Sequence, residues 1–282
     1  MASPDSPPSP RNDSLTVPPA ARLLFNRCNL PAAVLGSWRF QQHPHPLELD
    51  GVRAIHADLF RRLERLSCPE ERVVQFMDYM VVYFALKRPE DQGFDPNSRV
   101  RRDKADYLRM LRGWLFNPDG REAAVLKGWV SSRFGLLPRY HGGVLDPPEG
   151  ETFRRYLAMQ SEGIYNTNFL EGQLDLLYTF CQEEMSRKFP DTRHMTLFRG
   201  LNRLEELPLL RKLDGHHRVV LLNNLNSFTR SRERADEFGD RILECAVPLG
   251  KIFFYNRLLP GILKGEEEFM VIGGVYEVTL AG

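Results

Sequence analysis

One stretch near the C-terminus decides both the fold class and the candidate chemistry: Gly265-Glu266-Glu267-Glu268-Phe269-Met270-Val271-Ile272. Its three carboxylates run into four apolar residues, which predict a buried strand, and Gly273-Gly274 then predict the turn that ends this strand. If the strand begins within the acidic run, its side chains alternate, so Glu266 and Glu268 share one face and Glu267 lies on the other. Two such carboxylates, about 7 Å apart, repel each other unless a positive charge lies between them. The pattern therefore indicates chemistry on a cationic group, with a solvated acidic loop as the alternative.

The surrounding sequence is rich in short apolar runs that alternate with turn residues. One short helix, Arg232–Phe238 with Ser231 as its N-cap, interrupts them. Strands are predicted at Met195–Phe198, Val219–Leu222, Ile242–Val247, Ile252–Tyr255, Phe269–Ile272 and Val275–Leu280.

The earlier part of the chain has helical spacing instead. Its 73–86 segment is apolar almost all round, which predicts a central helix, and the Gly- and Pro-containing segment 140–148 predicts a linker. Other helical patterns cover 52–66, 107–115, 123–130 and 151–188. Helices followed by closely spaced strands predict an α+β fold, with a helical N-terminal half and a mostly antiparallel sheet or sandwich.

The composition divides the chain into three regions. Residues 1–20 are rich in Pro and Ser and predict a disordered tail, because they cannot bury enough apolar surface to offset their ordering entropy. A mainly helical region is predicted over 21–150, and a strand-rich core over 151–282.

The bulk numbers exclude several function classes. A net charge of +1 favours neither a nucleic-acid partner nor an anionic membrane. No apolar run is long enough to span a bilayer and no signal sequence is visible, so we expect a cytoplasmic protein. The four cysteines lack the spacing of a zinc site or a disulfide framework, and no metal is expected.

Three elements of the strand-rich half stand out as candidate chemistry. Arg199-Gly200 could offer a guanidinium fork to a diphosphate where the backbone allows close approach. Ser227 and Thr229 alternate onto one face, where their hydroxyls can hydrogen-bond a carboxylate on a neighbouring strand. The third element is the Glu266-x-Glu268 pair. Taken singly, each fits an ordinary turn, a polar strand end or a surface loop.

In this order, the three elements resemble the arginine, S-x-T/S and E-x-E elements of the arginine-specific mono-ADP-ribosyltransferases. The helical half, with residues 36–40 (GSWRF) and 76–80 (FMDYM), resembles the dinitrogenase reductase ADP-ribosyltransferases of nitrogen-fixing bacteria over most of the chain after residue 20. The resemblance implies a core of ADP-ribosyltransferase type. It also implies transfer of ADP-ribose from NAD to an arginine of the nitrogenase iron protein (dinitrogenase reductase), which switches nitrogen fixation off, and a PII signalling protein as a further partner.

The resemblance also implies a role for each candidate on the NAD side. Arg199 would bind the diphosphate, and Gly200 would give the nicotinamide close access to the backbone. Ser227 and Thr229 would brace the catalytic carboxylate and the NAD. The G-x-G-x-x-G dinucleotide fingerprint is absent, so NAD would not be bound in the Rossmann manner.

The two glutamates receive separate roles by the same resemblance. Glu268 would bind a hydroxyl of the nicotinamide ribose and stabilise the oxocarbenium ion, whereas Glu266 would hold the acceptor guanidinium and help remove its proton. Glu267 should be dispensable. Two alternatives stay open: an NAD glycohydrolase or a transferase with another acceptor, and a catalytically silent interaction protein whose helical half carries the function.

Overall fold

The computed structural model describes residues 15–86, 106–145, 150–165, 167, 169–202, 207–261 and 267–281. Residues 15–20 fall within the segment predicted to be a tail, and Val17 among them is buried. The helices that precede the sheet are η1 (Pro19–Ala21), α1 (Ala32–Leu35), α2 (Trp38–Gln42), α3 (Val52–Ile55), α4 (Ala57–Glu64), α5 (Pro69–Tyr83), α6 (Tyr107–Phe116), α7 (Arg121–Phe134), α8 (Glu151–Ile164) and α9 (Leu170–Lys188).

The strands of the described chain form one antiparallel sheet, so the predicted α+β class is confirmed. Its central strand is β6, which pairs with β3 on one side and with β5 and then β4 on the other. Strand β1 pairs with β4 and meets β3 at one residue pair, so β1, β4, β6 and β3 close a ring. The elements are β1 (His194–Leu201), β2 (Leu209–Lys212), β3 (His217–Thr229), α10 (Arg232–Asp236), β4 (Arg241–Pro248), η4 (Leu249–Lys251), β5 (Ile252–Tyr255), η5 (Asn256–Leu258) and β6 (Glu268–Ala281).

The predicted turn at Gly273-Gly274 is wrong, because β6 runs through both glycines without a break. Asn223 and Asn224 of β3 bulge opposite Gly273, where any side chain would collide with the carbonyl oxygen of Asn223. Gly274 has φ +132°, and a Cβ there would lie 3.0 Å from the Cα of Gly36. The glycines therefore allow other backbone segments to approach the central strand closely.

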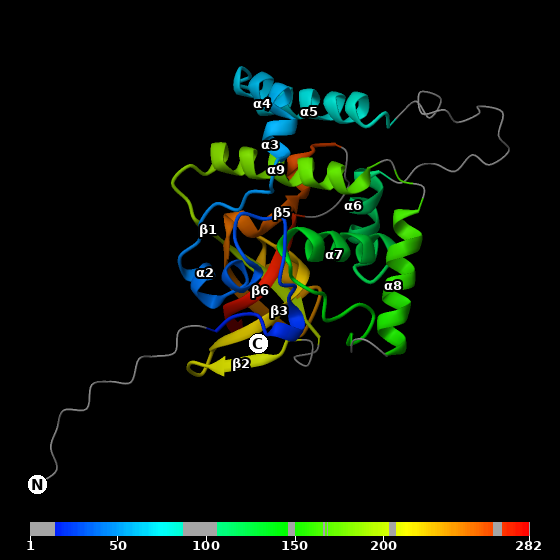
Figure 1. Cartoon of the computed structure of the whole chain (residues 1–282). Helices are drawn as coiled ribbons and strands as arrows, with labels where there is room; N and C mark the ends of the chain where they lie inside the picture. The colour runs from blue at the N-terminus through cyan, green and yellow to red at the C-terminus, as the bar shows by residue number, and fades with distance from the viewer. Residues whose placement is uncertain are drawn as a thin grey trace, which may run out of the picture.

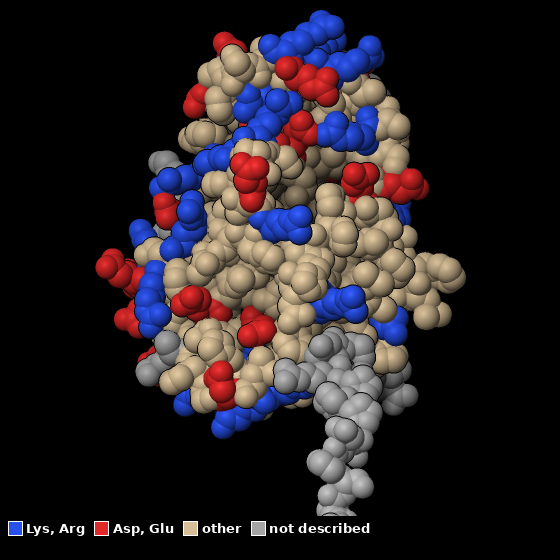
Figure 2. All heavy atoms as spheres, turned by 90° about the vertical axis from the view of Figure 1, so that its left-hand side faces the viewer, with Lys and Arg blue, Asp and Glu red and all other residues tan. Residues whose placement is uncertain are grey.

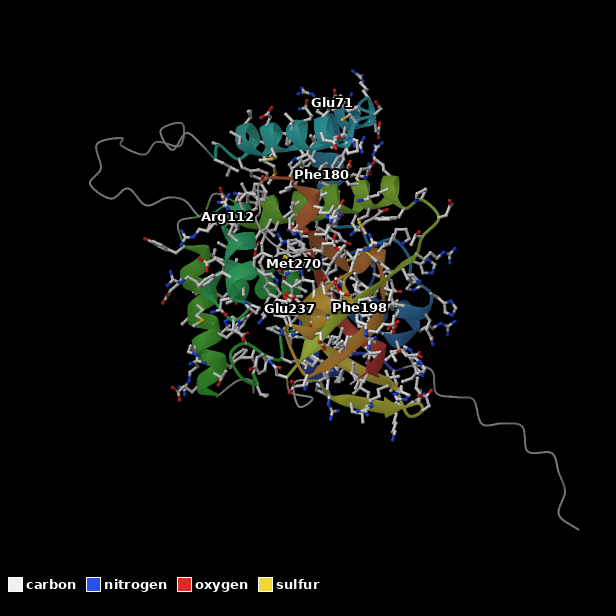
Figure 3. All side chains as sticks on the ribbon, turned by 180° about the vertical axis from the view of Figure 1, so that it is seen from behind. Glu71, Arg112, Phe180, Phe198, Glu237 and Met270 are labelled. Carbon is white, nitrogen blue, oxygen red and sulfur yellow. The ribbon has the colours of Figure 1, made fainter. Side chains whose placement is uncertain are left out.

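Helix α9 lies across the sheet, with α3–α5 above it and α6–α8 to one side (Figure 1). The prediction of a central 73–86 helix is wrong, because α5 covers only the outer face of α9 and leaves Val74 60% and Val82 80% exposed. Phe76 is one of its contacts with α9, where its ring stacks on Phe180 at a centroid distance of 4.1 Å. Phe180 lies between the two helices, and Met270 lies in the middle of the sheet (Figure 3). The helices with the most buried residues are α7 and α9 instead.

The GSWRF segment attaches the helical half to the central strand. The carbonyl oxygen of Gly36 accepts a hydrogen bond from Val275 N at 2.8 Å. Ser37 caps α2 by accepting from Phe40 N, and the Trp38 indole donates to Glu277 at 3.2 Å. One hydrophobic core consequently includes residues of both the helices and the sheet.

The surface carries mixed charge. Lys and Arg side chains gather at the top of the face in Figure 2, where α4 and α5 lie, with acidic side chains among them. Within the ranges described, no helix combines the length and the apolar character needed to cross a membrane.

Candidate active site

Glu268 is the first residue of β6, and its half-buried carboxylate receives hydrogen bonds from two other elements. Ser227 Oγ, near the end of β3, donates to Glu268 Oε1 at 2.6 Å. The indole nitrogen of Trp114, on α6, lies 2.9 Å from the same oxygen and 3.0 Å from Ser227 Oγ. A strand, a neighbouring strand and a helix thus meet at one carboxylate.

The register of β3 and β6 explains how the candidate hydroxyls reach this position. Thr229 pairs directly with Glu268, and Ser227 pairs with Met270, so all four side chains share one face of the sheet. The predicted hydrogen bond to a carboxylate on a neighbouring strand is present for Ser227. Thr229 Oγ1 accepts from Ser231 N at 3.2 Å and so stabilises the turn into α10.

Arg199 and Gly200 lie near the end of β1, beside the same end of β3. Arg199 Nη1 donates to the carbonyl oxygen of Ser227 at 3.2 Å, which brings the guanidinium beside the hydroxyl that binds Glu268. Gly200 packs against α10, and a side chain there would collide with the carbonyl oxygen of Ala235. The structure therefore brings together Arg199, Gly200, Ser227, Thr229 and Glu268.

The acidic run itself differs from the sequence expectation, because the strand begins only at Glu268. Glu267 lies in a bend before β6 and forms an ion pair with Arg257 of η5. The prediction that Glu267 lies on the opposite face from Glu268 assumed a strand through the whole acidic run. It does not apply to Glu267, because this residue precedes the strand. Glu266 lies outside the described residues.

Trp114 is the site residue that the sequence did not reveal. The spacing of α6 places it on the apolar face, and it is only 2% exposed, as a core aromatic would be. A buried indole needs a partner for its N–H, but which partner it finds depends on the packing of distant segments. No local signal in the sequence identifies that partner as Glu268.

A buried amine lies behind Trp114. Lys127 of α7, 2% exposed, has its Nζ 5.8 Å from the Trp114 ring centroid. It donates to Asp119 Oδ1 at 3.1 Å and to the carbonyl oxygens of Pro118 at 2.8 Å and Tyr140 at 3.1 Å. Burial lowers the pKa of Lys127 to about 8, although Asp119 opposes this shift.

His141 completes this cluster and lies within the segment predicted to be a linker. Its Nδ1 is 3.1 Å from Lys127 Nζ, and its Nε2 is 3.4 Å from the sulfur of Met159. Burial, and next the charge of Lys127, lowers the pKa of His141 to about 4. If His141 Nδ1 shares one of the three Lys127 N–H groups, the neutral imidazole carries its proton on Nε2.

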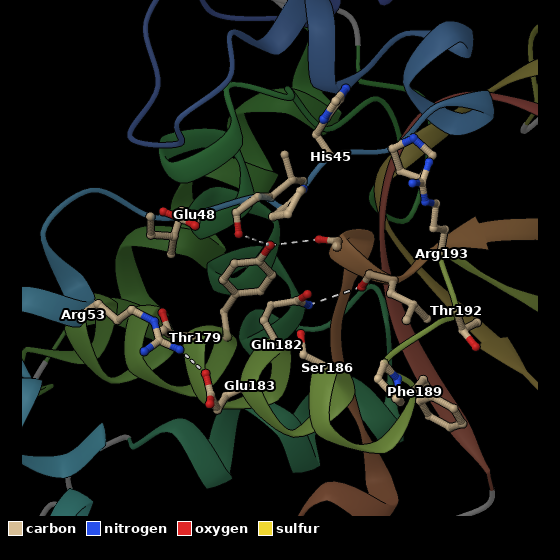
Figure 4. Close-up of a pocket in the computed structure, with 18 residues that line it drawn as sticks. His45, Glu48, Arg53, Thr179, Gln182, Glu183, Ser186, Phe189, Thr192 and Arg193 are labelled. Carbon is tan, nitrogen blue, oxygen red and sulfur yellow. Dashed lines mark hydrogen bonds and ion pairs between the residues drawn. The ribbon is translucent and has the colours of Figure 1, made fainter. Parts of the chain in front are cut away.

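A pocket of about 510 Å³ lies elsewhere, between α9, the segment 44–49 and Leu249-Gly250 (Figure 4). Tyr178 donates across it to the carbonyl oxygen of Gly250 at 2.9 Å, and Gln182 donates to the carbonyl oxygen of Leu249 at 3.3 Å. None of the candidate site residues that the structure describes lines this pocket. The described residues hold no group of three or more His, Cys, Asp or Glu suited to a metal ion.

The fold and the hydrogen-bonded Glu268 carboxylate agree with the ADP-ribosyltransferase class that the sequence motifs indicate. Comparison with known proteins identifies the family. A family model described as dinitrogenase reductase ADP-ribosyltransferase matches residues 25–280, so the chain belongs to this family. It is 39% identical over 257 residues to the NAD(+)--dinitrogen-reductase ADP-D-ribosyltransferase of Rhodospirillum rubrum, and the match covers 90% of this chain and 93% of that protein. No solved structure matches it.

Proposed function

We propose that this protein transfers ADP-ribose from NAD to an arginine of dinitrogenase reductase, the iron protein of nitrogenase, and so inactivates it and switches off nitrogen fixation. The observation that carries the proposal is the Glu268 carboxylate, held by Ser227 with Arg199 alongside. Family membership and the name of the R. rubrum relative support both the reaction and the target.

In the proposed reaction, the bond between the ribose C1′ and the nicotinamide nitrogen breaks, and its electron pair leaves with nicotinamide. Glu268 stabilises the positive charge that develops on the ribose, because a fixed carboxylate is most effective where charge appears in the transition state. A guanidinium nitrogen of the target then bonds to C1′, and Glu266 accepts its proton. No step needs a metal.

The remaining candidates bind and orient NAD in this proposal. Arg199 binds the diphosphate through its guanidinium fork, which Lys could not reproduce. Thr229 lies opposite Glu268 and contacts NAD beside it, and Gly200 presents its backbone to the nicotinamide. Its packing against α10 is a second reason for glycine at this position.

Two finer expectations belong to the same proposal. The enzyme acts in the cytoplasm, and a PII signalling protein binds it as a regulator. Size-exclusion chromatography of the protein mixed with a purified PII protein checks the second expectation. Separate elution at micromolar concentrations would remove PII from the proposal without affecting the reaction.

The reaction is tested by incubating the protein with NAD labelled in its adenylate part, with and without dinitrogenase reductase. We expect label on dinitrogenase reductase and release of nicotinamide. Glu268→Gln keeps the shape but removes the charge, so both signals should fall about a hundredfold or more. Release of free ADP-ribose without protein labelling would instead support the glycohydrolase. The absence of both signals would support a catalytically silent interaction protein.

A further inference from the structure

The indole N–H of Trp114 makes a contact that neither the family motifs nor the proposed reaction assigns. It points at Glu268 Oε1 and Ser227 Oγ, at 2.9 and 3.0 Å, from a helix 154 residues earlier in the chain than Glu268. We propose that Trp114 is a positioning residue for the catalytic carboxylate. The inference rests on the proposed function, because it assigns to Trp114 a role in the reaction that Glu268 carries.

The physical reason lies in how a carboxylate is held in place. A Glu side chain can rotate about several bonds, and its orientation is fixed only when donors reach it from more than one direction. Ser227 donates along the sheet, from the neighbouring strand, and Trp114 donates from α6, a helix that packs on α7 and α9. Both contact Oε1, so together they fix this oxygen in position before NAD binds. Preorganisation of this kind lowers the barrier because no reorientation is needed during the reaction.

Trp114 is itself held firmly enough to orient another group. Its ring is buried, and the ammonium of Lys127 faces it from behind at 5.8 Å. Gly113, next to it in α6, allows α7 to approach so closely that a side chain at 113 would collide with Glu122. The indole nitrogen is therefore fixed by the packing of α6 on α7.

The competing explanation is that Trp114 is a core residue whose N–H merely found an acceptor. Trp129 on α7 provides the comparison, because it too is 2% exposed and donates to a carboxylate, Asp175 Oδ1, at 2.8 Å. Asp175 is paired with Arg133 through two hydrogen bonds, at 2.7 and 2.9 Å, and belongs to no part of the candidate site. If Trp114 had only a structural role, loss of its indole N–H should change kcat and the melting temperature in the same way as loss of the Trp129 N–H.

The experiment replaces each tryptophan in the full chain and measures kcat and KM for nicotinamide release, together with the melting temperature. Two replacements are made at each position: Phe, and benzothienylalanine, which keeps the bicyclic shape but has sulfur in place of N–H. At Trp114 we expect both to lower kcat about tenfold to a hundredfold, the effect of losing a hydrogen bond to a charged group. KM for NAD should stay within about twofold, because the lost contact acts mainly in the transition state.

At Trp129, the same replacements should lower the melting temperature but leave kcat within about twofold of wild type. The inference is overturned if benzothienylalanine at position 114 gives wild-type kcat, or if the two positions lose kcat equally. If Trp114→Phe fails to fold, the benzothienylalanine variant decides the question, since it preserves the packing. A wild-type protein that releases no nicotinamide would refute the proposed function itself, and this inference with it.

Discussion

At the scale of single residues, Glu267 and Glu268, the two described carboxylates of the acidic run, are chemically identical but have different surroundings. Both are half-buried, but Glu268 accepts a hydrogen bond from Ser227, whereas Glu267 pairs with the exposed side chain of Arg257. An ion pair of that kind contributes little to stability. Chemical identity in the sequence therefore does not imply equivalence in the reaction.

Single substitutions should separate these carboxylates. Glu267→Gln should leave both nicotinamide release and protein labelling near wild type, because it removes only a surface ion pair. Glu266→Gln should lose labelling of the target arginine while nicotinamide is still slowly released by hydrolysis. The two activities are measured on the same preparations. A Glu267→Gln protein that is inactive in both would show that the catalytic pair has been misassigned by one residue.

His141 predicts a loss of stability in acid. Its folded-state pKa of about 4 lies below the ordinary value of 6.5, so between these values the unfolded chain binds more protons than the folded one. The stabilisation is complete above pH 6.5 and is lost as the pH falls towards 4, by up to about 3 kcal/mol. Lys127, Asp119 and Arg155 are the charged groups that act on His141.

Urea unfolding at pH 7.5, 6.0 and 5.0 measures this dependence. His141→Gln should flatten the fall in free energy of unfolding between pH 6 and 5, and the control His216→Gln, at an exposed position, should not. Equal slopes for wild type and His141→Gln would show that this histidine does not cause the acid sensitivity.

At the scale of elements, the bulge in β3 and the glycines in β6 form one unit that positions the site. The side chain of Asn224 donates to the carbonyl oxygens of Lys127 at 2.8 Å and Leu136 at 3.0 Å, which attaches the bulge to α7. Ser227 follows three residues later on the same strand. The bulge therefore connects the strand that braces Glu268 to the helix that lies behind Trp114.

Gly273→Ala should disrupt this unit. A methyl group there collides with the backbone of Asn223, which cannot move without shifting the bulge, so we expect a loss of about 3 kcal/mol. In a chain of this size, that corresponds to a fall in melting temperature of about 10 °C. Gly215→Ala is the matched control, because nothing lies within 4 Å of its Cβ position, and its melting temperature should not change. Equal melting temperatures for the two variants would contradict the close approach.

At the scale of the whole molecule, the helical region and the strand-rich core share buried ion pairs as well as apolar contacts. Arg72 of α5 binds Glu184 of α9 through two hydrogen bonds, at 2.6 and 2.9 Å, and Arg133 of α7 binds Asp175 of α9 in the same way. Both pairs cross the boundary proposed at residue 150. Separating the regions would leave these carboxylates without partners and expose the shared core.

We therefore expect the full chain to unfold in one thermal transition and the fragment 151–282 to remain unfolded on its own. Calorimetry measures the first, since a single cooperative unit has equal calorimetric and van't Hoff enthalpies. Circular dichroism of the purified fragment measures the second. Two separate transitions, or a fragment with a cooperative melt, would establish two independent domains.

The sequence by itself determined that a helical half precedes the strands, the α+β class and the five candidate residues that the structure brings together. These follow from alternation, helical spacing and short motifs, which depend on neighbours along the chain. Only the tertiary structure decided that Gly273-Gly274 lie within a strand, that α5 packs on the outside and that Trp114 reaches Glu268. Each of these depends on which distant segments pack together. A close approach of two backbones, a buried helix face and a hydrogen bond between elements are all contacts between residues far apart in sequence.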